Sequence, residues 1–280
     1  MNTHYQRRSG RPDRLAVFDI ETLAPPVPDG GFPPWPLHSI VVASVLQCDF
    51  ERYGQWRFNL ESVTFEDDPA VAIERVSYLL ENRTAISYNG RGFDAPVLAA
   101  CAMRHRKLDL RGIAEIWRSH RFAGTHIDLA DVVSGFGAAR GGSLERLGQA
   151  LGFPVKLDAH GSEVGEMMAA GRLADVVRYC ESDCCATACL YALVHGLREN
   201  EPEYGASLID QLGRWVRSQQ LGHLDAFARI EGAETLQRLS LAGIVVEGLK
   251  SLDLREHMLW VTHEPGSSGL TSPTSSDFPA

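Results

Sequence analysis

The stretch LAVFDIET, residues 15–22, sets the interpretation of the whole chain. Its apolar residues predict a buried β-strand. Side chains alternate across a strand, so Asp19 and Glu21 project from one face and can bind a common ligand. Buried carboxylates need a cation close by, because an unpaired buried charge is costly. The stretch therefore predicts a divalent-metal site, unless the strand ends near Phe18 and the acids lie in a solvated turn.

The composition allows a sizeable core and gives the chain an acidic character. At 280 residues and 44% hydrophobic content, the chain is long enough for one large domain with attachments or for two small domains. The formal net charge of -9 argues against a protein that coats duplex nucleic acid through a broad basic surface. An enzyme that binds a short polyanionic end through metal ions is still possible, because the ions supply local positive charge.

The hydropathy pattern bears on location. The sequence has no apolar run of about eighteen residues, so it predicts no transmembrane helix and no membrane partner. The first residues, MNTHYQRRSGRPDR, are polar and basic and lack the apolar stretch of a secretory signal. We therefore expect a cytoplasmic protein.

Turn residues and apolar periodicity divide the rest of the chain into strands followed mostly by helices. After a proline-rich loop at residues 24–36, strands are expected at 39–48, 55–65 and 84–88, with close neighbours antiparallel. Helices are expected at 69–82 behind an Asp68 cap, 94–104, 126–133, 143–151, 162–170, 175–197 and 204–230, with a further element at 239–249. Beyond about Glu264 the Ser/Thr/Pro/Gly-rich composition predicts disorder.

Two further polar motifs follow the opening strand. Asp94 ends the segment Asn89-Gly90-Arg91-Gly92-Phe93-Asp94, which comes directly after the strand at 84–88. Tyr179 and Asp183 are four residues apart on a late helix and therefore share one helical face. Taken singly, Asp-x-Glu, Asn-x3-Phe-Asp and Tyr-x3-Asp are weak signals, so their order along the chain carries the interpretation.

In this order the motifs resemble those of the DEDD exonucleases of the ribonuclease H-like superfamily, in the subclass with tyrosine in the last motif (DEDDy). The likeness is greatest to the predicted PolB-like 3′-5′ exonucleases, related to the proofreading domain of family B DNA polymerases. It covers roughly residues 14–197 and includes the stretches His126-Ile127-Asp128-Leu129, Ser143-Leu144-Glu145, Leu151-Gly152-Phe153-Pro154 and Gly161-Ser162 with Val164. It implies an α/β, ribonuclease H-like (DnaQ-like) fold: a central mixed β-sheet flanked by helices, with a helical C-terminal part.

The resemblance also implies roles for individual residues. Four carboxylates would bind metal: Asp19, Glu21, Asp94 and Asp183. Tyr179 would position the attacking water. Three residues would contact the substrate: Thr22, Leu23 and Asn89. The implied cofactors are two Mg²⁺ or Mn²⁺ ions per active site, which agrees with the preference of these hard ions for oxygen ligands. Cys184-Cys185, after the last motif, departs from the family pattern.

We therefore expect a metal-dependent 3′-5′ exonuclease, without a polymerase domain, that hydrolyses the 3′ end of single-stranded nucleic acid. DNA is the expected substrate. Three alternatives stay open: the same chemistry on RNA or short oligonucleotides, a non-catalytic nucleic-acid-binding module with this fold, and an unrelated phosphoesterase with histidine ligands. The expected organisation is a flexible N-terminus at 1–13, the nuclease domain at 14–200, a helical extension at 201–263 and a disordered tail at 264–280.

Other patterns have plainer interpretations. The spacing of Cys180, Cys184, Cys185 and Cys189 predicts small core residues of a buried helix rather than zinc ligands. His126 is expected to pack or to support the site rather than to bind metal. No Gly-Lys-Ser/Thr follows the glycines at 135–142, so no phosphate-binding loop is expected. Six basic residues are either a solvated helix face or a phosphate-binding surface: Arg104, Arg106, Lys107, Arg111, Arg118 and Arg121.

Overall fold

The computed structural model describes residues 11–28, 31–139, 142–155, 163–230 and 233–262. In these residues five strands form one mixed sheet in the order β3-β2-β1-β4-β5. The strands are β1 (Arg14–Leu23), β2 (Ser39–Phe50), β3 (Trp56–Thr64), β4 (Thr84–Ser87) and β5 (His126–Asp128). β1 pairs antiparallel with β2 and parallel with β4, which places the stretch at 15–22 in the middle of the sheet.

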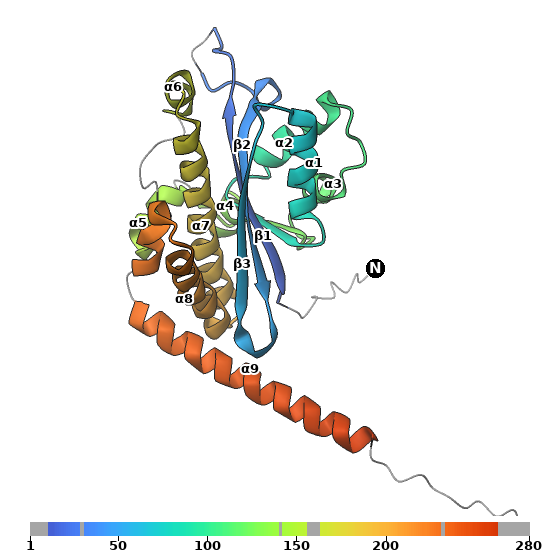
Figure 1. Cartoon of the computed structure of the whole chain (residues 1–280), viewed down its shortest axis with the longest axis vertical. Coiled ribbons are helices and arrows are strands. Elements are labelled where there is room, and N and C mark those ends of the chain that lie inside the picture. The colour runs from blue at the N-terminus through green and yellow to red at the C-terminus, as the bar shows by residue number, and fades with distance from the viewer. Residues whose placement is uncertain (1–10, 29–30, 140–141, 156–162, 231–232, 263–280) are drawn as a thin grey trace, which may run out of the picture.

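Helices cover both faces of this sheet (Figure 1). On one face lie α1 (Pro69–Leu80), α2 (Asp94–Arg104) and α3 (Arg111–Arg118). On the other lie α7 (Leu173–Arg198) and α8 (Pro202–Gln219), with α4 (Leu129–Val133), α5 (Leu144–Leu151) and α6 (Val164–Ala169) beside them. Short 3-10 helices are η1 (Trp35–Leu37), η2 (Arg52–Gly54) and η4 (Gly222–Arg229).

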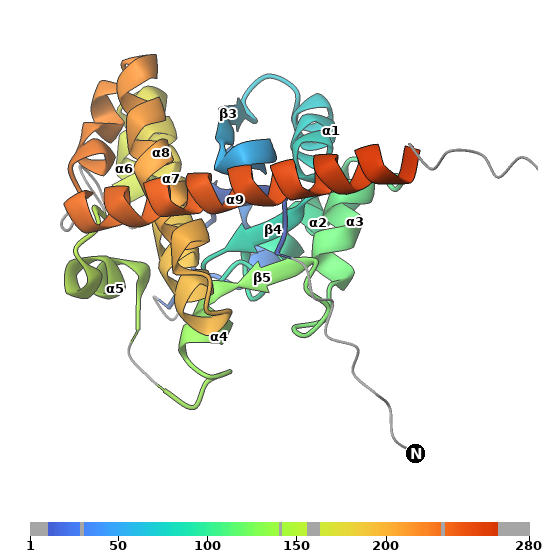
Figure 2. The ribbon, with the colours of Figure 1, turned by 90° about the horizontal axis from the view of Figure 1, so that it is seen from below.

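The last helix, α9 (Ala233–Thr262), crosses the end of the molecule at which β2 turns into β3 (Figure 2). Gly54 in that turn has φ +75 and would bring a Cβ within 3.1 Å of the Ile244 backbone. The turn therefore needs glycine both for its backbone conformation and for the approach of α9. Among the described residues, no helix has the length and apolar character needed to cross a membrane.

The alternation of side chains along β1 decides which helices meet the acids. Ala16, Phe18 and Ile20 pack in the core between the sheet and α1, α2 and α3. Leu15 and Val17 pack in the core between the sheet and α7 and α8. Asp19 and Glu21 continue the second series, so both carboxylates face α7.

Most of the expected elements are present, but two were assigned wrongly. Residues 126–133 were expected to be one helix; instead β5 comes first and Asp128 caps α4 by accepting from the Ala130 N–H at 3.0 Å. Residues 204–230 were also expected to be one helix. α8 ends where Gln220 adopts a left-handed conformation, φ 57, and η4 follows. The expected tail at 264–280 and residues 1–10 of the expected flexible N-terminus lie outside the described residues.

Candidate functional site

Three carboxylates meet where β1 passes beneath α7. One carboxylate oxygen from each of Asp19, Glu21 and Asp183 lies within 4.8 Å of the other two. Asp19 and Glu21 come from one face of β1, and Asp183 comes from the middle of α7. This triad brings together residues more than 150 positions apart in the sequence, and its oxygens could hold a metal ion.

The electrostatics of the triad favour a bound cation. Burial raises the pKa of Asp19 well above its ordinary value, and the charges of the neighbouring carboxylates raise it further. Only the thiol of Cys180, which donates to Asp19 Oδ2 at 3.5 Å, acts in the opposite direction. Burial likewise raises the pKa of Glu21, followed by the charges of Asp183 and Asp94. Burial and mutual repulsion therefore disfavour the charged forms of these carboxylates, and a positive ion between them would favour the charged forms.

Asp94, the fourth expected carboxylate, stands at the first position of α2 and is 6% exposed. Burial raises its pKa to about 8, with a further contribution from Asp128, while its own backbone N–H opposes the shift. Asp94 is not one of the three residues within 4.8 Å of one another. Its charge nevertheless raises the pKa of both Asp19 and Glu21, so it faces the same site from the side opposite α7.

Gly90 makes room for the Asp94 side chain. A Cβ at this position would lie 2.5 Å from Ser87 Oγ and 2.7 Å from Asp94 Oδ2. Real Cβ atoms do not approach other atoms so closely, because the overlap is strongly repulsive. The loop between β4 and α2 therefore needs glycine at residue 90 to seat the carboxylate.

Asp128 fixes this loop, a role that the sequence did not reveal. It is 3% exposed and accepts from the backbone N–H groups of Asn89 at 2.8 Å and Arg91 at 2.9 Å. The Arg91 side chain in turn donates to Asp131, to the Ser119 carbonyl and to the His126 carbonyl. These bonds hold the segment that leads into Asp94. The sequence feature that could have indicated this role is an acidic residue directly after a short strand.

Tyr179 lies one turn before Asp183 on α7 and is 8% exposed. Burial raises the pKa of its phenol, and the nearby carboxylates and a hydrogen bond with Asp183 raise it further. The hydroxyl therefore stays protonated and donates to Asp183. The two side chains share one face of α7, as their spacing of four residues predicted.

Three residues are expected to contact substrate: Thr22 and Leu23 directly follow Glu21, and Asn89 begins the loop that leads to Asp94. Thr22 Oγ1 is 2.7 Å from His38 Nδ1, and His38 Nε2 is 3.0 Å from the Pro33 carbonyl. Since a carbonyl only accepts, Nε2 carries the proton and the Thr22 hydroxyl donates to Nδ1. Leu23 is 37% exposed. Asn89 is exposed and has φ 63, a conformation that asparagine tolerates better than most residues.

An aromatic group beside these residues went unnoticed in the sequence. The ring centroids of Phe32 and His38 are 5.1 Å apart, and Phe93 lies 4.8 Å from His38 and 5.6 Å from Phe32. Phe93 directly precedes Asp94, and Phe32 is 77% exposed. The group therefore offers an exposed aromatic surface next to the carboxylates.

Three residues of the basic segment have partners within the protein. Lys107 pairs with Glu74, and Arg111 pairs with Glu81 at 3.3 Å, so both join α1 to its neighbours. Arg104 donates to the Pro36 carbonyl. For these three residues, a solvated helix face is therefore a better interpretation than a phosphate-binding surface.

The cysteines and His126 have packing roles. All six cysteines are free and buried, as the spacing of the four in α7 predicted for those four. His126 lies between Ser87 Oγ at 2.8 Å and the Ile116 carbonyl at 3.3 Å. Burial lowers the pKa of His126 to about 4, so the ring is neutral at ordinary pH. It is not part of the triad.

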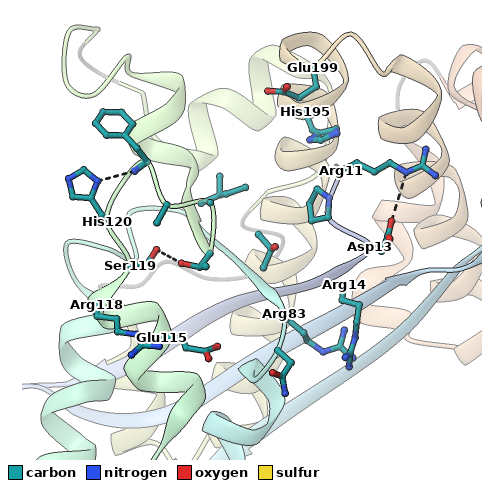
Figure 3. Close-up of a pocket in the computed structure, with 18 of the residues that line it drawn as sticks. Arg11, Asp13, Arg14, Arg83, Glu115, Arg118, Ser119, His120, His195 and Glu199 are labelled. Atoms are coloured by element: carbon teal, nitrogen blue, oxygen red, sulfur yellow. Dashed lines mark hydrogen bonds and ion pairs between the residues drawn. The ribbon is translucent and has the colours of Figure 1, made fainter. Parts of the chain in front are cut away.

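A large groove of about 1530 Å³ lies at the opposite end of the sheet, where β1 and β4 begin and α7 ends (Figure 3). Its charges are mostly paired. Arg83 donates to Asp49 at 2.7 Å, Arg11 pairs with Glu247 at 3.0 Å, and His195 lies 3.3 Å from Glu201. The groove therefore differs from the triad, where carboxylates gather within 4.8 Å of one another.

The mixed sheet with helices on both faces, and the buried carboxylates on its central strand, define an α/β protein of ribonuclease H-like fold with an acidic site suited to divalent metal. The chain belongs to the family of predicted 3′-5′ exonucleases related to the exonuclease domain of PolB, whose sequence profile matches residues 30–230. This match includes Asp94, Tyr179 and Asp183 and begins after Asp19 and Glu21.

A solved structure of a family B DNA polymerase from the hyperthermophilic archaeon Pyrobaculum calidifontis is similar to 78% of this chain. The chain covers 27% of that polymerase, with 19% sequence identity and a TM-score of 0.47. Comparison with curated proteins gave no match.

Proposed function

We propose that the chain is a 3′-5′ exonuclease of the DEDD type with tyrosine in the last motif. It would hydrolyse the terminal phosphodiester at the 3′ end of single-stranded nucleic acid with two Mg²⁺ or Mn²⁺ ions. DNA is the proposed substrate. The observation that carries the proposal is the convergence of Asp19, Glu21 and Asp183, with carboxylate oxygens within 4.8 Å of one another. The relation of the family to the exonuclease domain of PolB supports DNA as the substrate.

The donor set fits the proposed ions. Asp19, Glu21 and Asp183 would hold them, with Asp94 facing the same space from α2, and oxygen-only ligands suit Mg²⁺ and Mn²⁺. When bound, such ions acidify water and stabilise the departing 3′ oxygen. The raised pKa values of Asp19 and Glu21 support the assignment, because positive charge at this place would offset the repulsion that raises them.

Tyr179 would orient the attacking water rather than deprotonate it. The direction of its pKa shift, upward through burial and the charge of Asp183, keeps the phenol neutral. A neutral phenol is a poor general base but a good hydrogen-bonding group. Its hydroxyl already points toward the triad through its bond to Asp183.

The surroundings of the triad suit single-stranded nucleic acid. Aromatic side chains bind single-stranded nucleic acid by stacking on bases, which a duplex would keep paired. The exposed ring of Phe32, beside His38 and Phe93, provides such a surface next to Asp94. Thr22, Leu23 and Asn89 are the proposed contacts to the terminal nucleotide.

The proposed nuclease domain spans residues 14–200, and a helical extension at 201–263 follows it. The extension contains α8, η4 and the described part of α9. Its α9 contacts the β2–β3 turn at the end of the domain away from the triad, whereas its η4 contacts α7 close to the triad, through His223 and Glu181.

The test is the degradation of 5′-labelled single-stranded DNA and RNA of the same sequence with Mg²⁺, Mn²⁺ or EDTA. A ladder that shortens from the 3′ end only with metal is the expected result, with DNA cut faster than RNA. Asp183→Asn, which keeps the shape of the side chain, is the matched control and should give no ladder. Faster cutting of RNA would reassign the substrate, and intact substrates under every metal condition would overturn the proposed activity in favour of a binding module.

A further inference from the structure

A row of polar side chains crosses three neighbouring strands beneath α7. Asp19 of β1 is paired in register with Ser44 of β2, and Ser44 is paired with Ser62 of β3. Paired residues of antiparallel strands project from the same face, so all three side chains face α7. Ser44 is fully buried, in a layer that is otherwise mainly apolar.

Glu181 of α7 accepts a hydrogen bond from the last residue of this row, Ser62. Ser62 Oγ donates to Glu181 Oε1 at 2.7 Å, and Ser44 Oγ lies 2.8 Å from Ser62 Oγ. The second carboxylate oxygen, Oε2, is 2.6 Å from Nε2 of His223 in η4. The side chains of Glu181 and His223 are only 15% and 18% exposed. One carboxylate therefore ties α7 to β3 and to η4.

The number of protons fixes the direction of these bonds. A carboxylate only accepts, so the single hydroxyl proton of Ser62 goes to Glu181 and Ser44 must donate to Ser62. At the other end of the row, the thiol of Cys180 has one proton and donates to Asp19, whose carbonyl oxygen lies at 3.4 Å and whose Oδ2 lies at 3.5 Å. Oriented hydrogen bonds thus run from Ser44 through Ser62 to Glu181, and Ser44 is the register partner of Asp19.

We propose that Glu181 is a positioning residue, which sets the rotation of α7 about its axis and thereby the place of Asp183 over β1. The inference rests on the proposed role of the triad as a metal site. Around Glu181, α7 contacts the sheet through small buried side chains such as Cys184, and apolar packing alone does not fix a rotation. Directional hydrogen bonds do.

A small rotation of α7 is enough to disturb the position of Asp183. A carboxylate about 6 Å from a helix axis moves by about 1 Å when the helix turns by about 10°. A displacement of that size is enough to degrade a functional site, whose groups must be held within about 0.5 Å. Because Glu181 lies between Tyr179 and Asp183, a rotation that breaks its bonds moves both residues together.

The experiment compares Mn²⁺ binding by the full chain, measured by titration calorimetry, in four variants. Glu181→Ala and Ser62→Ala remove the bonds, and Glu181→Gln keeps an acceptor for Ser62 and a donor for His223. Ser207→Ala is the matched control. It removes the buried serine hydroxyl that accepts from Trp56 Nε1 at 2.9 Å, and so breaks a different bond between β3 and a helix.

We expect Glu181→Ala to bind Mn²⁺ about tenfold more weakly, the lower end of the effect of losing a group that orients metal ligands. Ser62→Ala should follow in the same direction. Glu181→Gln should bind like the wild type, and Ser207→Ala should lower the melting temperature without changing Mn²⁺ binding. In oligonucleotide assays kcat should fall in Glu181→Ala while KM stays unchanged.

Unchanged Mn²⁺ binding in Glu181→Ala would overturn the inference, as would equal losses in the alanine and glutamine variants. If the wild type itself binds no Mn²⁺, the proposed metal site fails, and amide hydrogen exchange of metal-free protein decides the positioning role. Faster exchange across residues 179–183 in Glu181→Ala than in Ser207→Ala would support it. Equal exchange in the two variants would refute it.

Discussion

Asp94 is a buried carboxyl group whose pKa of about 8 is raised mainly by burial. In the unfolded chain the same group ionises near its ordinary value, 3.8. Between these two values the unfolded state gives up its proton and the folded state keeps it, so the free energy of unfolding falls as the pH rises. Replacing Asp94 with asparagine removes this dependence while keeping the shape of the side chain. The metal-free variant should therefore be more stable than the wild type.

The size of the effect follows from the pKa difference. Each pH unit in this window costs the folded wild type about 1.4 kcal/mol, so the advantage of Asp94→Asn grows by about 3 kcal/mol between about pH 5 and pH 7. For a chain of this size, 1 kcal/mol corresponds to about 2–4 °C in melting temperature. The melting temperatures should therefore diverge by about 6–12 °C over this range.

The assay is thermal unfolding in EDTA, followed by circular dichroism, at matched pH for the wild type and the variant. The comparison at equal pH removes the contribution of His126, whose lowered pKa of about 4 destabilises both proteins as the pH falls below about 6.5. Glu66→Gln, which neutralises an exposed acid, is the control and should follow the wild type.

Two results would refute this reasoning. Melting temperatures that stay parallel between about pH 5 and pH 7 would show that Asp94 ionises in the folded protein at an ordinary pH. A variant that is less stable than the wild type at pH 7 would show that the carboxylate has a partner that the structure does not contain. Added Mn²⁺ should reverse the order, because the ion stabilises only the protein that binds it.

Three further predictions concern the same site. Tyr179→Phe should lower kcat while Asp19→Ala abolishes activity, because only the carboxylate would hold metal; equal losses in an oligonucleotide assay would contradict this ranking. Millimolar Mg²⁺ or Mn²⁺ should raise the melting temperature of the wild type and not of Asp183→Asn; a melting curve that ignores metal would count against the site. Gly90→Ala, whose Cβ would lie 2.5–2.7 Å from three heavy atoms, should cost about 1–3 kcal/mol of stability and weaken Mn²⁺ binding. Gly92→Ala, with its nearest neighbour at 3.4 Å, is the control and should change neither quantity.

The sequence was sufficient for features that depend on local pattern. Period-two alternation in residues 15–22 placed Asp19 and Glu21 on one face of a strand, and the structure has them on the face toward α7. Asp68 followed by proline predicted the start of α1, and the Asp68 side chain does accept from two backbone N–H groups there. Such signals survive because they involve neighbouring residues only.

Features that depend on distant pairing could not be predicted. β5 has three residues, too few to show a period, and its strand character comes from pairing with β4. The role of Asp128 depends on a loop 39 residues earlier in the chain. The row from Asp19 through Ser44 to Ser62 exists only because the register of β1, β2 and β3 aligns these residues, and a register belongs to pairs of strands rather than to any one stretch of sequence.

The buried acids of the chain fall into two groups that differ in what the protein supplies to them. Asp128 receives three backbone N–H groups, and Glu181 receives a serine hydroxyl and a histidine N–H, so both are satisfied within the fold. Glu21 and Asp94 are buried and Asp19 is partly buried, and for all three both burial and neighbouring carboxylates raise the pKa. The hydrogen-bond donors of the fold go to the supporting acids, Asp128 and Glu181, and the acids of the site are left to be stabilised by positive charge. Without metal, the folded protein is therefore less stable. That cost is the physical reason to expect metal binding and the stability of this domain to be coupled, and it vanishes if the metal-free protein proves as stable at high pH as at low pH.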